Sequence, residues 1–148
     1  MKKLNDILAA VGGLLQPVFL LAVRLYWGWG FFGTGKGKLA HLDKVTGYFQ
    51  TLNIPMPHLN AIVAGSVETV GGLLLVVGLF SRIVTLPLMF TLAIAYLTAE
   101  SDALHAFFSD PDKFTGATPF LFLFAMLIIF VFGPGCISLD RIFFKEKV

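Results

Sequence analysis

The sequence predicts an all-α fold: an integral membrane, antiparallel four-helix bundle with short interfacial helices, in a single domain over residues 1–148. Hydrophobic residues make up 57% of the chain and charged residues 14%, whereas an average soluble domain has about 25% charged residues. Four apolar stretches approach the roughly 20 residues that a membrane-crossing helix needs, and glycine or proline separates them. We expect the spans at residues 14–32, 59–80, 83–99 and 118–133.

The residues before the first span carry apolar side chains at helical spacing: Leu4, Ile7, Leu8, Val11, Leu14 and Leu15. This spacing predicts a short helix that lies in the membrane interface. Lys2 and Lys3 are followed by Leu4-Asn5-Asp6 and by no evident cleavage site, so a cleavable signal is not expected. The first span contains Arg24, and the aromatic residues that follow it are typical of a membrane interface.

Residues 33–58 form the first connector, in which Gly33, Gly35 and Gly37 are expected to end the first helix. Apolar residues at steps of three or four predict a short amphipathic helix over residues 38–52 that covers the outer end of the bundle. The residues expected to face inward are Leu39, Leu42, Val45 and Phe49. An ordinary solvated loop is the alternative.

The later boundaries are marked by polar residues and helix breakers. Ser81 and Arg82 form a turn between the second and third spans, and an acidic connector over residues 100–117 precedes the fourth. The fourth span opens at Thr118-Pro119, a capping residue followed by proline in the first turn, and stops at Gly133-Pro134-Gly135. Residues 138–148 are expected to form a short interfacial tail.

The positive charges indicate the orientation of the chain. Four spans place both termini on one side, with six lysine and arginine residues: Lys2, Lys3, Arg82, Arg141, Lys145 and Lys147. The other side has four: Lys36, Lys38, Lys44 and Lys113. The excess of positive charge on the cytoplasmic side of membrane proteins therefore favours cytoplasmic termini.

Two charges, Arg24 and Glu68, lie within predicted spans, where a lone charge is costly. Arg24 is nine residues before Gly33, and Glu68 is seven to nine residues after the outer end of the second span at 59–61. Their expected depths agree, so we expect the two side chains to pair in the outer half of the bundle. The pair would either fix the register of two helices or line a ligand or proton site, and both interpretations stay open.

The second span presents Glu68 on a face of small residues, which lets a neighbouring helix approach closely. These small residues are Ala61, Gly65 and Gly72. A quinone head group needs a hydrogen-bond donor, an acceptor and apolar walls near the interface, and Arg24, Glu68, Trp27 and Tyr96 could supply them. For Tyr96, a place in the aromatic belt is the alternative.

Several kinds of site have no sequence pattern to support them. Cys136 is the one cysteine, so the chain has no internal disulfide and no Cys-x-x-Cys redox pair. His41, His58 and His105 match no metal-site spacing, and no metal is expected. No pattern indicates a nucleotide loop, a haem site or a nucleic-acid surface, so no cofactor is expected to be held by the chain itself.

Three motifs in order resemble those of the DoxX-like family of small membrane proteins. The motifs are Arg24-Leu25-x-x-Gly28-x-x-Phe31-x-x-x-Gly35-x-x-Lys38-Leu39, then Glu68-x-x-Gly71-Gly72-x-Leu74-x-x-x-Gly78-Leu79-x-x-Arg82, and finally Gly133-Pro134-Gly135-x-x-Ser138-Leu139-Asp140. The motif positions carried over as structural are Gly28, Gly35, Lys38, Gly71, Gly72, Arg82 and Asp140. Thr34 departs from the pattern, because many relatives have a histidine there, so a proton-transfer step that used this histidine would be missing.

The resemblance implies a four-helix protein of the bacterial inner membrane. Named members of that family include a subunit of a thiosulfate:quinone oxidoreductase. This implies a membrane subunit of a quinone-linked or redox-supporting system, with a quinone or small hydrophobic ligand near Arg24 and Glu68 and an oxidoreductase partner that supplies electrons. The alternatives are a non-enzymatic scaffold or assembly partner, and a small homo-oligomeric transporter in which Glu68 binds protons or cations. Family membership alone does not establish a reaction.

Overall fold

The computed structural model describes residues 1–144, and over these residues the chain is helical without strands. Three helices are long and apolar enough to cross a membrane: α1 (Lys2–Ala40), α3 (Pro57–Val77) and α4 (Ser81–Thr98). A fourth apolar helix, α7 (Thr118–Phe132), has 15 residues. The expected all-α membrane protein is confirmed. The expected tail is described as far as α8 (Leu139–Phe144), and residues 145–148 lie outside the described part.

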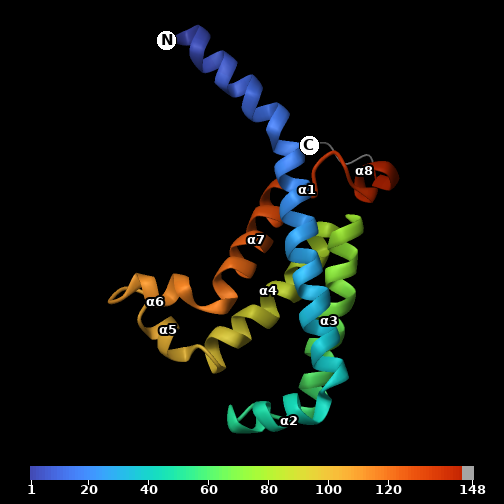
Figure 1. The fold of residues 1–148 in the computed structure, drawn as a ribbon, viewed down its shortest axis with the longest axis vertical. Coiled ribbons are helices and arrows are strands. Elements are labelled where there is room, and N and C mark those ends of the chain that lie inside the picture. Colours follow the sequence, from blue (N-terminus) through green and yellow to red (C-terminus); the bar gives the residue numbers. More distant parts are fainter. Residues whose placement is uncertain (145–148) are drawn as a thin grey trace.

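The first helix is much longer than expected. α1 has 39 residues, which makes it about 58 Å long, and it runs without a break through Pro17 and through Gly33, Gly35 and Gly37. The predictions of a separate interfacial helix and of a helix end at Gly33 are therefore wrong. Residues 1–15 are exposed and project beyond the other helices at the top of Figure 1.

Helices α1 and α3 lie side by side and antiparallel, and glycines let their backbones touch (Figure 1). A Cβ atom on Gly72 would lie 2.5 Å from Phe32 N and 2.6 Å from Gly28 O. A Cβ atom on Gly35 would lie 2.7 Å from Gly65 O. Glycine costs roughly 1 kcal/mol in a helix relative to alanine, but Gly28 and Gly35 are required for helix contact, so these two glycines of α1 mark an interface rather than a break.

Replacing Gly72 by alanine is expected to lower the free energy of unfolding by about 1–3 kcal/mol, because the new methyl group would push α1 away from α3. Gly33→Ala is the matched control, since no atom lies within 4 Å of a Cβ at that position. The control should unfold at the wild-type temperature or slightly above it. Thermal unfolding in detergent measures both variants, and equal melting temperatures would contradict the close contact of α1 and α3.

The apolar core joins α3 to α4 and α7, with one residue from α1. Its buried members are Phe31, Leu75, Val84, Leu88, Leu92, Ala125, Met126 and Ile129. Gly71 packs directly against Leu88 of α4, where a Cβ atom would lie 3.1 Å from the leucine side chain. α4 and α7 lie together and diverge from the α1–α3 pair toward the end of the molecule at which α2 lies (Figure 1).

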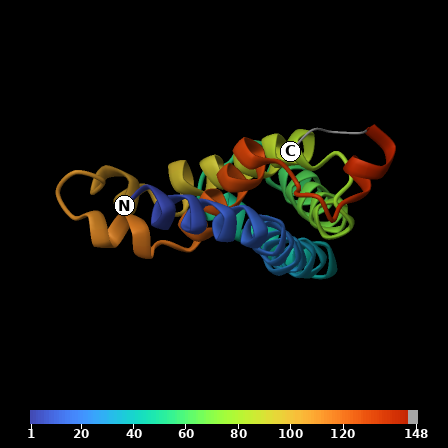
Figure 2. The ribbon, with the colours of Figure 1, turned by 90° about the horizontal axis from the view of Figure 1, so that it is seen from above.

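Short helices occupy both ends of the molecule. α2 (Leu42–Thr51) packs on α3 and confirms most of the helix expected over residues 38–52, although residues 38–40 belong to α1. The expected inward-facing residues of this segment are partly buried. α5 (Ser101–His105) and α6 (Pro111–Gly116) connect α4 to α7. Viewed from above, α5 and α6 lie at one edge of a flat molecule, and α8 lies toward the opposite edge (Figure 2).

Candidate functional site

Arg24 is buried at the α8 end, where its guanidinium group holds the loop that follows α7. Its Nη1 donates to Pro134 O and its Nη2 donates to Ile137 O, each at 2.8 Å. The rigid, planar donor group of arginine suits two carbonyls presented by one loop. Gly78, at φ +73°, lies against the guanidinium group, where a Cβ atom would be 2.6 Å from Cζ. Arg24 therefore joins α1, the end of α3 and the C-terminal loop.

Asp140 completes this junction from α8. Its carboxylate accepts hydrogen bonds from Phe80 N at 2.6 Å and Ser81 N at 2.8 Å, at the start of α4. Its backbone N–H donates to Gly78 O at 2.8 Å. A carboxylate at a helix N-terminus satisfies backbone donors that have no partner within the helix. We call Arg24, Asp140 and the backbone groups that they bind the C-terminal clamp.

Glu68 of α3 contacts α1 at a different height along the helix from the C-terminal clamp. Its carboxylate forms a salt bridge with Lys38 Nζ through Oε1 and accepts a hydrogen bond from Thr34 Oγ1 at 3.1 Å through Oε2. The Glu68 side chain is 7% exposed and that of Lys38 is 30% exposed. A charge in a membrane-spanning helix therefore has a counter-ion and a neutral donor.

The expected contact between Arg24 and Glu68 is wrong. Because Gly28 meets Gly72 and Gly35 meets Gly65, the α1 residues level with Glu68 lie near Thr34. Thr34 is ten residues beyond Arg24, or about 15 Å along the helix. The depth estimate failed because it took Gly33 as the end of a helix that continues to Ala40.

The other two expected ligand-binding residues have separate surroundings. Tyr96 donates a hydrogen bond to Phe114 O at 3.0 Å and stacks on the Phe114 ring at 4.9 Å, so it ties α4 to α6. Trp27 packs edge to face on Tyr26 at 5.2 Å and on Phe122 of α7 at 4.7 Å. Within residues 1–144, Arg24, Glu68, Trp27 and Tyr96 thus contact four different sets of partners.

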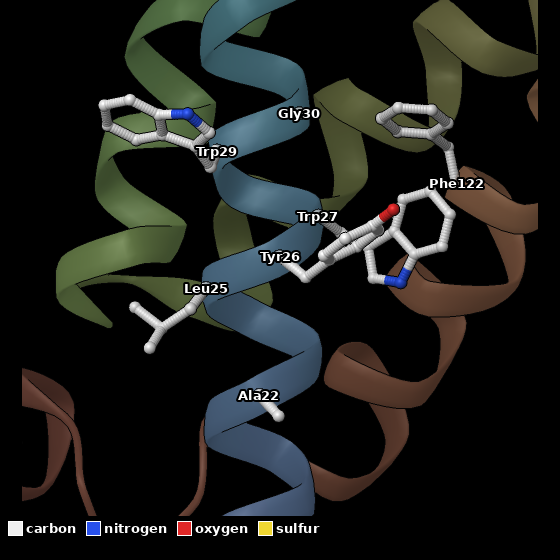
Figure 3. Close-up of a pocket in the computed structure, with 7 residues that line it drawn as sticks. All are labelled: Ala22, Leu25, Tyr26, Trp27, Trp29, Gly30 and Phe122. Atoms are coloured by element: carbon white, nitrogen blue, oxygen red, sulfur yellow. The ribbon is translucent and has the colours of Figure 1, made fainter.

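Trp27 lies in an open pocket of about 760 Å³ between α1 and α7, which we call the aromatic groove. Its lining residues are Ala22, Leu25, Tyr26, Trp27, Trp29, Gly30 and Phe122. Figure 3 shows Tyr26 and Trp27 reaching toward α7, with Leu25 and Trp29 on the other side of α1. Tyr26 and Trp29 are 73% and 64% exposed. Tyr26 and Trp29 project from a different face of α1 than Arg24 and Lys38, whereas Trp27 shares a helix face with Lys38, which lies eleven residues further along.

Thr34 and Lys38 were missed as partners of Glu68, although both carry a recognisable signal. They are four residues apart, so a continuous helix places a hydroxyl and an ammonium group on one face, and Gly35 lies on the adjoining contact face. Arg82, another motif residue, lies against Gly133, where a Cβ atom would be 3.0 Å from Nη2. Among the described residues no group of three His, Cys, Asp or Glu side chains could hold a metal ion.

Comparison with known proteins gives one family. The DoxX family matches residues 19–101, from α1 to the start of α5. The chain is 32% identical to the inner membrane protein YphA of Escherichia coli over 135 residues, which cover 87% of this chain and 93% of that protein. It is 30% identical to the uncharacterized membrane protein Rv3486 of Mycobacterium tuberculosis, covering 84% and 81% of the two chains. It is also 30% identical to an uncharacterized protein of Haemophilus influenzae, covering 88% and 95%. No solved structure matches. The chain belongs to the DoxX family of membrane proteins.

Proposed function

We propose that this chain is a multi-pass inner-membrane subunit that supports a quinone-linked oxidoreductase system by holding a quinone, or a similar small hydrophobic ligand, in the aromatic groove. The groove is the observation that carries the proposal, because Tyr26 and Trp27 of α1 gather there beside Phe122 of α7 (Figure 3). The name of the E. coli relative supports the inner membrane as the location.

The chemistry of the groove suits a quinone. A quinone ring stacks on aromatic side chains, and its two carbonyl oxygens can accept hydrogen bonds from the phenol O–H of Tyr26 and the indole N–H of Trp27. The volume of about 760 Å³ is within the usual range for small-molecule sites. Since the groove holds aromatic and apolar residues alone, electrons would pass between the quinone and a partner oxidoreductase.

The proposal retains Trp27 from the four ligand-binding residues expected from sequence. Ligand binding by Arg24, Glu68 and Tyr96 stays a prediction. Nη1 and Nη2 of Arg24 and the hydroxyl of Tyr96 donate hydrogen bonds to backbone carbonyls within the chain. The groove residues Tyr26 and Trp29, by contrast, are largely exposed.

Binding of a short-chain ubiquinone to the purified protein in nanodiscs tests this function. Wild type should bind saturably, and Trp27→Ala should raise the dissociation constant about tenfold, or 1.4 kcal/mol. Phe90→Ala is the matched control, because Phe90 is an aromatic residue of α4, 66% exposed and outside the groove. Non-saturable binding, or equal binding by wild type and Trp27→Ala, would reject the groove as the site. Tyr96→Phe and Glu68→Gln are measured in the same titration, because ligand binding by Tyr96 and Glu68 is still a prediction.

We further propose that α1, α3, α4 and α7 all cross the membrane, with both termini in the cytoplasm. The 15 residues of α7 make a helix of about 22 Å, short for the roughly 30 Å hydrocarbon core, so its flanking residues would enter the interface. Cysteines introduced at Lys2 and at Asp110, after replacement of Cys136, should react with membrane-impermeant reagents from opposite sides of the membrane. Reaction of both from one side would rule out this topology.

A further inference from the structure

The geometry points to Glu68, Lys38 and Thr34 as a proton-exchange site: Glu68 takes up one proton when Lys38 swings out toward the α2 end, and releases it when Lys38 returns. In the closed form the carboxylate and the ammonium group are paired. In the open form a proton from water has bound a Glu68 oxygen, and the ammonium group is solvated. One O–H bond of a hydronium ion breaks, one O–H bond forms on Glu68, and nothing is oxidised or reduced. This site is separate from the aromatic groove and does not depend on the quinone proposal.

Lys38 is the part of the pair that can move. Its side chain is 30% exposed, whereas that of Glu68 is 7% exposed. Lys38 lies two residues before the end of α1 at Ala40, so its four-carbon stem starts near the edge of the bundle. Lysine side chains in such positions extend along apolar surface and place the ammonium group in water. Glu68, in the middle of α3, has no comparable route.

Thr34 can satisfy Glu68 in both protonation states. Its hydroxyl lies 3.0 Å from Phe31 O and 3.1 Å from Glu68 Oε2, both of which are acceptors for its single proton. When Glu68 is ionised, Thr34 donates to the carboxylate. When Glu68 is protonated, the carboxyl O–H donates to Thr34 Oγ1, and Thr34 donates to Phe31 O instead. Thr34 therefore remains the partner of Glu68 Oε2 in both states, whereas Oε1 loses Lys38 in the open form.

Lys38 is the charged group that faces Glu68. The helices packed on α3 are α1, α2 and α4. The titratable residues on and beside α2 are His41, Asp43, Lys44 and Tyr48, all exposed, and His58 at the start of α3 is exposed and bonded to Thr46. α4 carries Arg82 as its charged residue, in its first turn at the opposite end. The buried site is therefore neutral in both forms, because a bound proton replaces the lysine charge, and neither form buries an unpaired charge.

Infrared difference spectroscopy of the full chain in nanodiscs tests the proposal. On moving from neutral to acid pH, wild type should gain the C=O band of one protonated, buried carboxyl group, and Glu68→Gln should lose this band. In Lys38→Met the band should already be present at neutral pH, since without its counter-ion the carboxylate is held as the neutral acid. Thr34→Val should keep the band but shift its frequency, because one hydrogen bond is lost.

Lys36→Met is the matched control, because Lys36 is an exposed lysine of the same helix that does not contact Glu68. It should behave as wild type. An acid-induced band that survives in Glu68→Gln, or a neutral-pH spectrum that is the same in Lys38→Met and Lys36→Met, would overturn the proposal. If Glu68→Gln does not fold, the comparison of the two lysine variants decides alone.

Discussion

Replacing Arg24 by methionine is expected to lower the free energy of unfolding by about 3–5 kcal/mol. The change removes two hydrogen bonds from a charged donor, each of which contributes roughly 1.5–3 kcal/mol, and it leaves Pro134 O and Ile137 O without their partners. The loop after α7 should then detach from α1 and α3. Unfolding in a denaturing detergent measures the loss, and limited proteolysis should show faster cleavage near residues 133–140.

Arg141→Met is the matched control for this prediction, because Arg141 is an exposed arginine of α8 outside the clamp. It should unfold within about 0.5 kcal/mol of wild type. Asp140→Asn should resemble Arg24→Met, since an amide has one acceptor oxygen for the two N–H groups that Asp140 now binds. A stability of Arg24→Met equal to that of Arg141→Met would mean that the clamp does not hold the C-terminal segment.

The second large effect concerns Lys38 and Glu68. Lys38→Met should lower the free energy of unfolding by about 2–3 kcal/mol, because Glu68 loses its counter-ion and must take up a proton to stay buried. The expected loss is at or below the usual loss for breaking a buried salt bridge, because the ammonium group of Lys38 is partly exposed to water. The double variant Lys38→Met, Glu68→Leu should recover much of the loss, since two apolar side chains can replace a buried pair at little cost.

Double-mutant cycles distinguish this pairing from the one expected from sequence. Lys38 and Glu68 should show a coupling free energy above about 1 kcal/mol, whereas the effects of Arg24→Met and Glu68→Leu should add within about 0.3–0.5 kcal/mol. The second pair is the control for the first. Coupling between Arg24 and Glu68, with none between Lys38 and Glu68, would show that α1 and α3 pack in another register.

Helix positions were predictable where a breaker coincides with a true helix end. The expected spans 59–80, 83–99 and 118–133 correspond to α3, α4 and α7 within three residues at each end. Pro57, Gly78 and Gly133 lie at these ends, with the two glycines in left-handed or extended conformations that favour glycine. The small face of Ala61, Gly65 and Gly72 was also predictable, because its spacing is local to one helix.

The end of α1 was not predictable in the same way. Gly35 is compatible with a helix break or with a close contact, and the choice depends on α3, which lies some thirty residues further along the chain. That error moved the expected end of the helix and with it the partner of Glu68. The partners of Arg24 are backbone carbonyls more than 100 residues away, and a carbonyl carries no sequence signal.

The candidate ligand site was predictable only in part. Trp27 was identified as an aromatic wall, but its neighbour Phe122 belongs to α7 and is one of sixteen phenylalanines in the chain. Tyr96 was grouped with Trp27 by residue type, and the fold directs it to Phe114 instead. Residue chemistry thus identified suitable side chains, whereas their grouping depended on helix register and tilt.

Photoaffinity labelling with a light-activated quinone analogue tests whether a quinone binds in the aromatic groove. The protein in nanodiscs would be labelled, digested and mapped by mass spectrometry, with excess unlabelled quinone as competitor. The competed label is expected on the α1 peptide containing Ala22 to Gly30 and on the α7 peptide containing Phe122. Competed label confined to residues 96–116 or 133–140, or no competed label at all, would contradict quinone binding in the aromatic groove.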